Sequence, residues 1–182
     1  HYEQETTMYE LTEFRKSKDQ YFGKSNDSPL LTEQRNHFTG LVYFPENSGL
    51  RFEVTIDEFP EKQVTEILTS TGESRPHLRW GSLSFAVEGQ DVTLTVYRGV
   101  DGVEFFLPFA DATSNKETYG SGRYLELLAL DEEKFLLDFN YAYNPYCAYN
   151  PRWSCPIPPF ENRLQVRIQA GEKIFPGAGS SG

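Results

Sequence analysis

The stretch LRWGSLSFAVEGQDVTLTVYRGVDGVEFFLPF, residues 78–109, decides the fold class. Apolar residues recur at about every second position through 78–87, 92–97 and 103–109, which is the period of a strand with one buried face. Turn-forming residues separate these runs, with Glu88-Gly89-Gln90-Asp91 after the first and Gly99-Val100-Asp101-Gly102 after the second. Three strands joined by such short turns predict an antiparallel sheet.

The same alternating pattern continues on both sides of this stretch. Further strands are predicted over 41–44, 50–56, 64–68, 124–130, 135–139 and 164–168. No helical pattern lies between them, and aromatic residues make up 15% of the chain, which suits strands. We therefore expect a mostly β, antiparallel domain that is barrel-like or sandwich-like.

One helix is predicted before the strands, over residues 7–22. Thr7 and Glu10 fit a capping box, and Gly23 supplies a stop. The remaining faces are charged, so the helix should pack on the outside of the domain. A further short turn of helix is expected at 28–33, and the domain should span 1–173 and leave 174–182 as a flexible tail.

The charge balance restricts the possible partners. The chain has 17 basic and 27 acidic residues, a net charge of −10. Nucleic acid and anionic membrane surfaces are disfavoured, because both are bound mainly through Lys and Arg. No apolar run is long enough for a membrane helix, and the polar first ten residues do not resemble a signal peptide. A soluble, cytoplasmic protein is expected, and the oligomeric state stays open.

The loop 108–124 is rich in small polar residues and ends on Arg123 at the start of a predicted strand. Together with Asp111, Thr113, Thr118 and Tyr119, Arg123 can bind a polar or anionic molecule, because a guanidinium offers a rigid fork. Alternatively, the polar side chains form turns and Arg123 pairs with a buried acid such as Asp111, Asp138 or Glu161. We favour the buried pair.

The segment 138–163 is long, irregular and almost uncharged between Asn140 and Phe160. It repeats Ala-Tyr-Asn-Pro at 142–145 and 148–151, and each Asn-Pro pair favours a turn. Its rings and amides can line a pocket, or they can fill the mouth of the domain. The candidate ligand-binding residues in this segment are Asn140, Tyr143, Asn144 and Asn162.

Cys147 and Cys155 are the only cysteines. A disulfide, two reduced structural thiols, and a catalytic thiol are all compatible with their spacing. Two cysteines are too few for a structural zinc site, and His37 and His77 lie at no ligand spacing, so no metal is expected. We favour thiols within bridging distance of each other.

The motifs PFADAT, TYGSGRYLEL, DFNYAYNPYCAYNPRWSCPIPPFENRL and IQAGEK resemble an uncharacterised, mainly prokaryotic family known as domain of unknown function 1684. The resemblance spans residues 10–173 and implies no activity. Asn115 stands where the family has glycine, and Asn can also adopt the left-handed backbone. The resemblance implies these signature residues: Asp111, Thr113, Thr118, Tyr119, Arg123, Asp138, Asn140, Tyr143, Asn144, Cys147, Cys155, Glu161, Asn162 and Glu172.

Three functions remain possible on these residues. The first is binding of a small polar or anionic molecule in a pocket formed by the 108–124 and 138–163 loops. The second is an enzyme, for example a hydrolase, with acid-base groups among Asp111, Asp138, Glu161 and Glu172 and charge stabilisation by Arg123. The third is a structural or interaction module. No nucleotide loop, dinucleotide fingerprint or nucleophile elbow is present, and no cofactor is expected.

Overall fold

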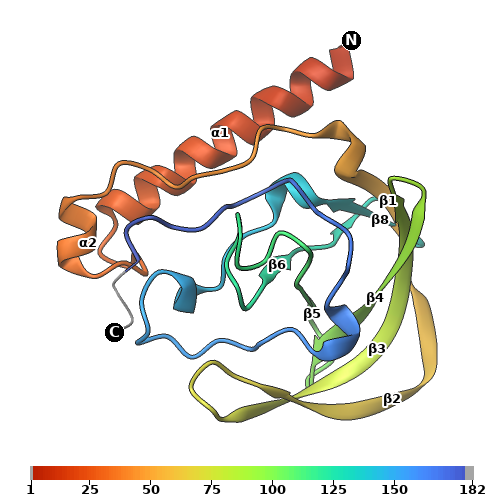
Figure 1. Cartoon of the computed structure of the whole chain (residues 1–182). Coiled ribbons are helices and arrows are strands. Elements are labelled where there is room, and N and C mark those ends of the chain that lie inside the picture. The colour runs from red at the N-terminus through yellow and green to blue at the C-terminus, as the bar shows by residue number, and fades with distance from the viewer. Residues whose placement is uncertain (1, 179–182) are drawn as a thin grey trace.

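The computed structural model describes residues 2–178, with side chains from Glu10 onward, and its strands form two antiparallel sheets (Figure 1). The larger sheet has the order β2-β3-β4-β5-β6, formed by Asp57–Leu68, Ser74–Val87, Gln90–Gly99, Phe105–Phe109 and Arg123–Leu125. The smaller sheet has the order β1-β8-β7, formed by Arg51–Thr55, Lys134–Asp138 and Leu128–Ala129. The mostly β, antiparallel prediction is confirmed, and the sheets form a sandwich-like arrangement rather than a closed barrel.

The hairpins follow from local turn chemistry. Val87 pairs with Gln90, and the two residues between them have positive φ, 49° at Glu88 and 78° at Gly89. Two consecutive positive φ values suit the right-handed twist of the flanking strands. The turn predicted at 88–91 is therefore present and fixes the register of β3 against β4.

The core lies between the two sheets. Leu94, Val96 and Phe109 of the larger sheet are fully buried, as is Leu137 of the smaller sheet. Phe139, which follows β8, packs its ring at an edge against Phe109 with the ring centres 5.3 Å apart. This apolar layer is the main source of hydrophobic stabilisation.

The predicted helix packs outside the sheets, as Figure 1 shows for α1 (Tyr2–Lys24). Its inner face buries Leu11 and Phe22. The predicted start is wrong: the helix begins at Tyr2, so Thr7 lies inside it and is not its cap. The second helix, α2 (Thr32–Asn36), also begins later than the predicted 28–33 turn, because Leu31 is still extended.

Two predicted strands are absent from the structure. Residues 164–168 alternate between more and less exposed side chains, but the backbone bends at 165–166. They bond to a loop: Leu164 N–H donates to the Ala110 carbonyl, and Ala112 N–H donates to the Val166 carbonyl. At 41–44 only Tyr43 forms a bridge, with Glu172. Alternation indicates a half-buried extended segment, and a strand needs a regular neighbour as well.

Other boundaries also shift. The strand predicted at 64–68 is part of the twelve-residue β2, and the strand predicted at 124–130 is split into β6 and β7. The irregular 138–163 segment contains three short 3-10 turns, at Phe139–Tyr141, Tyr146–Ala148 and Phe160–Asn162.

The last part of the described chain packs against α1. Phe175, in the stretch expected as a tail, is buried with Phe22, Leu30 and Tyr149, while 179–182 lie outside the described residues. No helix within residues 2–178 is long and apolar enough to span a membrane.

Candidate functional site

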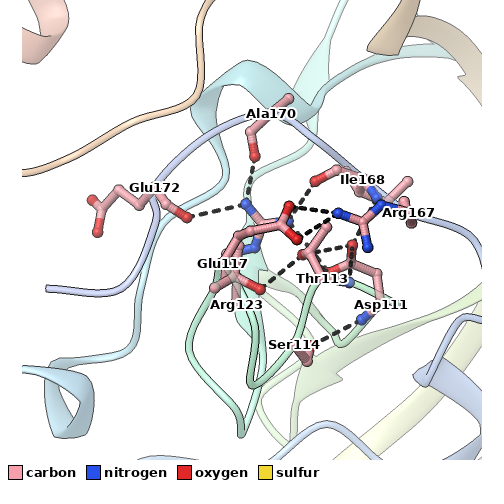
Figure 2. A network of polar contacts seen from close by, with 10 residues as sticks. Asp111, Thr113, Ser114, Glu117, Arg123, Arg167, Ile168, Ala170 and Glu172 are labelled. Carbon is pink, nitrogen blue, oxygen red and sulfur yellow. Dashed lines mark hydrogen bonds and ion pairs between the residues drawn. The ribbon is translucent and has the colours of Figure 1, made fainter.

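Arg123 lies at the centre of a closed polar network (Figure 2). It begins β6 and is fully buried. Its guanidinium donates to the backbone carbonyls of Ile168 at 3.0 Å, Glu172 at 3.2 Å and Ala170. It also forms an ion pair with Asp111 at 3.4 Å. Burial lowers the pKa of Arg123, and the nearby Asp111 carboxylate opposes that shift.

The Asp111 carboxylate is satisfied within the same network. It accepts hydrogen bonds from Ile168 N–H at 2.7 Å and from the Thr113 hydroxyl at 2.8 Å. Thr113 in turn shares a hydrogen bond of 2.8 Å with Thr118. The network therefore joins the 108–124 loop to residues 168–172. Because all of these side chains are buried, Arg123 does not face solvent.

The backbone around this network depends on two special positions. Gly122 has φ +100°, and a Cβ there would lie 2.4 Å from the Phe109 carbonyl oxygen. Asn115 has φ +67°, which confirms that it adopts the left-handed backbone expected where the family has glycine. Both turns bring the loop back so that Arg123 points inward.

Glu172 bonds to both α1 and the 138–163 segment. Its carboxylate is buried and accepts hydrogen bonds from Lys18 of α1, from the Tyr149 hydroxyl at 2.6 Å and from Asn144 N–H at 3.2 Å. Burial and the adjacent Glu172 carboxylate raise the pKa of Tyr149 well above its usual value, so Tyr149 remains a donor. Glu172 therefore holds α1 against the long C-terminal loop.

Asp138 and Asn140 form a third cluster, at the end of β8. Arg51 donates to Asp138 at 3.0 Å and to Glu46 at 2.9 Å. The Asn140 side chain donates to Asp138 at 2.8 Å and accepts from Asn47 N–H at 2.8 Å. These bonds fix the loop before β1 against the start of the 138–163 segment.

Glu161 and Asn162 have different environments although they are adjacent. Glu161 is partly exposed and receives two hydrogen bonds from Arg79, at 2.9 and 3.1 Å, and one from Tyr97. Asn162 is fully buried and bridges two strands, donating to the carbonyls of Thr95 and Pro108 at 2.8 Å each. Asn162 thus completes backbone bonding between β4 and β5.

The predicted site residues are therefore divided among several clusters. The four candidate acids, Asp111, Asp138, Glu161 and Glu172, each have their own fixed donors. The 108–124 and 138–163 loops meet beside a hollow of about 240 Å³, and the candidate residues that line it are Tyr119 and Cys147. Among the side chains that the structure describes, from Glu10 to residue 178, no three His, Cys, Asp or Glu residues are grouped to hold a metal ion.

Cys147 and Cys155 lie together in the structure and are not joined by a disulfide. The backbone N–H of Cys147 donates to the Cys155 sulfur at 3.2 Å, and the Tyr119 hydroxyl donates to the Cys147 sulfur at 3.6 Å. A hydrogen bond from the Cys155 thiol, with smaller contributions from Tyr119 and Ser70, lowers the pKa of Cys147 to about 6. The same pairing, together with burial, raises the pKa of Cys155.

A larger cavity lies between α1 and the smaller sheet. We call it the α1 cavity; its volume is about 420 Å³ and its lining residues are Glu10, Phe14, Arg51, Glu126, Leu128, Leu136, Asp138, Tyr141 and Tyr143. Only Asp138 and Tyr143 were candidates from the sequence. Phe14 lies on the charged helix α1, and Glu126 lies just before the two-residue strand β7. Only the packing of α1 brings both to the same cavity.

The fold and these clusters define a two-sheet antiparallel protein whose C-terminal loops are fixed by buried polar networks. The chain belongs to the family described as protein of unknown function (DUF1684), which matches residues 36–173. It is similar to the solution NMR structure of an uncharacterized protein of Haloarcula marismortui, with 33% identity and a TM-score of 0.70 over 94% of this chain and 96% of that one. No curated protein matches the chain. The resemblance drawn from the motifs is confirmed.

Proposed function

We propose that the protein binds a small molecule with an apolar body and a cationic group in the α1 cavity. The observation that supports this is a concavity of about 420 Å³ that is lined by apolar and aromatic side chains together with three carboxylates and one arginine. That volume falls within the range of small-molecule sites, which are mostly apolar with a few polar groups that orient the ligand.

The apolar wall exposes side chains that would gain from being covered. Phe14 is 43% exposed and Leu128 is 61% exposed. Phe14 packs at an edge against Tyr141 with the ring centres 5.0 Å apart, so the two rings form a fixed corner. A ligand with an apolar body would remove this surface from water, at a gain of about 25 cal/mol per Å².

The charges around the cavity favour a cation. Arg51 is already paired with Asp138 and Glu46, so its charge is satisfied. Glu126 accepts a hydrogen bond from the neutral Tyr143 hydroxyl, at 2.5 Å, and Glu10 also lines the cavity. An ammonium group would meet carboxylates and aromatic faces, whereas an anion would meet repulsion. Because Arg123 is buried, the anionic ligand considered from the sequence has less support.

The test compares two probes that differ only in charge, 4-phenylbutylamine and 4-phenylbutyrate, by isothermal titration and amide chemical shifts. The amine should bind and shift resonances around Tyr141 and Leu136. Glu126→Gln should weaken amine binding about fivefold. Phe14→Ala should weaken it further without loss of the fold, since Phe14 is partly exposed.

The matched control is Glu66→Gln, an exposed carboxylate on β2 outside the α1 cavity. It should bind the amine as the unmodified protein does. Equal binding of amine and acid, or amine binding that Phe14→Ala leaves unchanged, would overturn the proposal.

A further inference from the structure

The hollow beside the 108–124 and 138–163 loops is lined by a cysteine sulfur. Cys147 is partly exposed and lines the hollow of about 240 Å³, together with Tyr119, Asn150 and Trp153. Cys155 is buried and does not line the hollow, and it is close enough for Cys147 N–H to donate to its sulfur at 3.2 Å. One cysteine therefore lines the hollow, and the second is buried next to the first.

Both thiols are held on fixed backbone. The Cys155 segment is attached to the end of β2, because its N–H donates to the Ser70 hydroxyl at 3.1 Å and Ser70 N–H donates to the Cys155 carbonyl at 2.9 Å. The loop between the cysteines is anchored to the Pro29 carbonyl, which accepts from Asn150 at 2.8 Å and from Trp153 at 2.9 Å. The sulfurs therefore stay adjacent without a covalent bond.

We propose that Cys147 and Cys155 form a reversible dithiol–disulfide pair, in which Cys147 reacts first with a hydroperoxide that enters the hollow. Cys147 is the accessible partner, and the Tyr119 hydroxyl is placed to donate to its sulfur. Cys155 is the resolving partner, since it is shielded from the oxidant but lies beside Cys147. The lowered pKa of Cys147 supports this order, because the thiolate is the nucleophilic form.

The reaction has two balanced steps. The Cys147 thiolate attacks the outer oxygen of the hydroperoxide, the O–O bond breaks, and the alcohol leaves after taking a proton from water, which produces the sulfenic acid. The Cys155 thiol then attacks the Cys147 sulfur. The S–O bond breaks, the S–S bond forms, and the hydroxyl leaves as water with the Cys155 proton. In total, two thiols lose two electrons and two protons, and an external dithiol can return both.

The first test treats the reduced, full-length protein with hydrogen peroxide and follows intact mass and free thiols. The mass should fall by two hydrogen atoms per chain, both thiols should disappear together, and dithiothreitol should restore them. Peptide mapping should place the bond between Cys147 and Cys155. A chain that keeps both thiols in excess peroxide, or that forms only dimers between chains, would overturn the proposal.

Single variants then assign the roles. Cys155→Ser should stop at a sulfenic acid on Cys147 that a cyclic 1,3-diketone traps, and Cys147→Ser should leave Cys155 reduced. Tyr119→Phe retains both sulfurs and removes one donor, so its oxidation rate should reach half of its maximum at a higher pH than the unmodified protein, for which about pH 6 is expected. Far-ultraviolet circular dichroism of each variant checks that it is folded. Trapping on Cys155 instead of Cys147, or an unchanged pH profile for Tyr119→Phe, contradicts the assignment.

Discussion

Lys18, on the N-terminal helix, donates a hydrogen bond to the carboxylate of Glu172, which lies 154 positions later in the sequence. The Lys18 side chain is 16% exposed and that of Glu172 is 1% exposed, so water screens this ion pair little. A buried carboxylate without its cation is costly. The position of α1 on the sheets is therefore coupled to the C-terminal loop by charge as well as by apolar contact.

Removal of Lys18 should destabilise the protein strongly. Lys18→Ala leaves Glu172 buried with only neutral donors, and we expect a loss of about 3 kcal/mol in the free energy of unfolding by urea. Lys16→Ala is the control, because the Lys16 side chain on the same helix is 70% exposed. Similar urea midpoints for the two variants would show that the Glu172 pair does not hold α1.

Arg123→Ala should be more damaging. It removes the donor to three backbone carbonyls and leaves Asp111 without its cation, so a loss of at least about 4 kcal/mol is expected. Arg123→Lys retains the charge but not the fork, and should lose roughly half as much. The control is Arg167→Ala, which breaks a surface pair with Glu117 in the same region (Figure 2) and should leave the thermal midpoint within about one degree. A midpoint for Arg123→Ala equal to that of Arg167→Ala would contradict the closed network.

Gly122→Ala should destabilise the protein by about 3 kcal/mol, measured by thermal unfolding. The alanine would have to keep the positive φ of Gly122, which strains a residue with a Cβ. Its Cβ would also lie 2.4 Å from the Phe109 carbonyl oxygen. Gly89→Ala isolates the first effect, because Gly89 has φ +78° with nothing within 4 Å of its Cβ position. It should lose about 1 kcal/mol. Equal losses of stability in Gly122→Ala and Gly89→Ala would mean that the close contact with the Phe109 carbonyl does not destabilise the protein.

Glu161 should contribute to stability at neutral pH and not in acid. Burial acts to raise its pKa, but the hydrogen bonds from Arg79 and Tyr97 outweigh burial and lower the pKa below its usual range. The ionised carboxylate therefore stabilises the fold above its unfolded pKa, and this stabilisation is lost as pH falls through the lowered folded pKa. The unmodified protein should melt above Glu161→Gln at pH 7, and the difference should shrink steadily as the pH is lowered through and below the usual pKa range of a glutamate. Glu66→Gln should show no such pH-dependent difference.

The strands with close neighbours along the chain could be predicted from the sequence, because alternation and turn residues act locally. The hairpin from Ser74 to Gly99 is the best example. Residues 164–168 show the limit of the same reasoning. Their alternation is real, but their hydrogen-bond partners lie in the 108–124 loop, and no local pattern reports that packing.

The structure brings some of the candidate residues together, but not into one common site. Asp111 and Arg123 do pair, and Asn144, Tyr149 and Glu172 do meet. The residue types indicate that each of these side chains needs a hydrogen-bond or ion-pair partner. They do not indicate which side of each cluster solvent or a ligand could reach. The α1 cavity was missed because Phe14 and Glu126 belong to segments far apart in sequence, and their proximity depends on how α1 docks.

The bond between Lys18 and Glu172 also has a consequence for synthesis on the ribosome. Lys18 is made early, and its partner carboxylate emerges only after another 154 residues have been added. Until then, the apolar face of the helix, with Leu11 and Phe22, has no completed surface to cover it. At about 5–20 residues per second, the helix waits for roughly ten seconds or more, which is long compared with the folding of a hairpin. A newly made chain of this protein is thus most open to aggregation, or to capture by a chaperone, at α1 while the residues up to Glu172 are still being added.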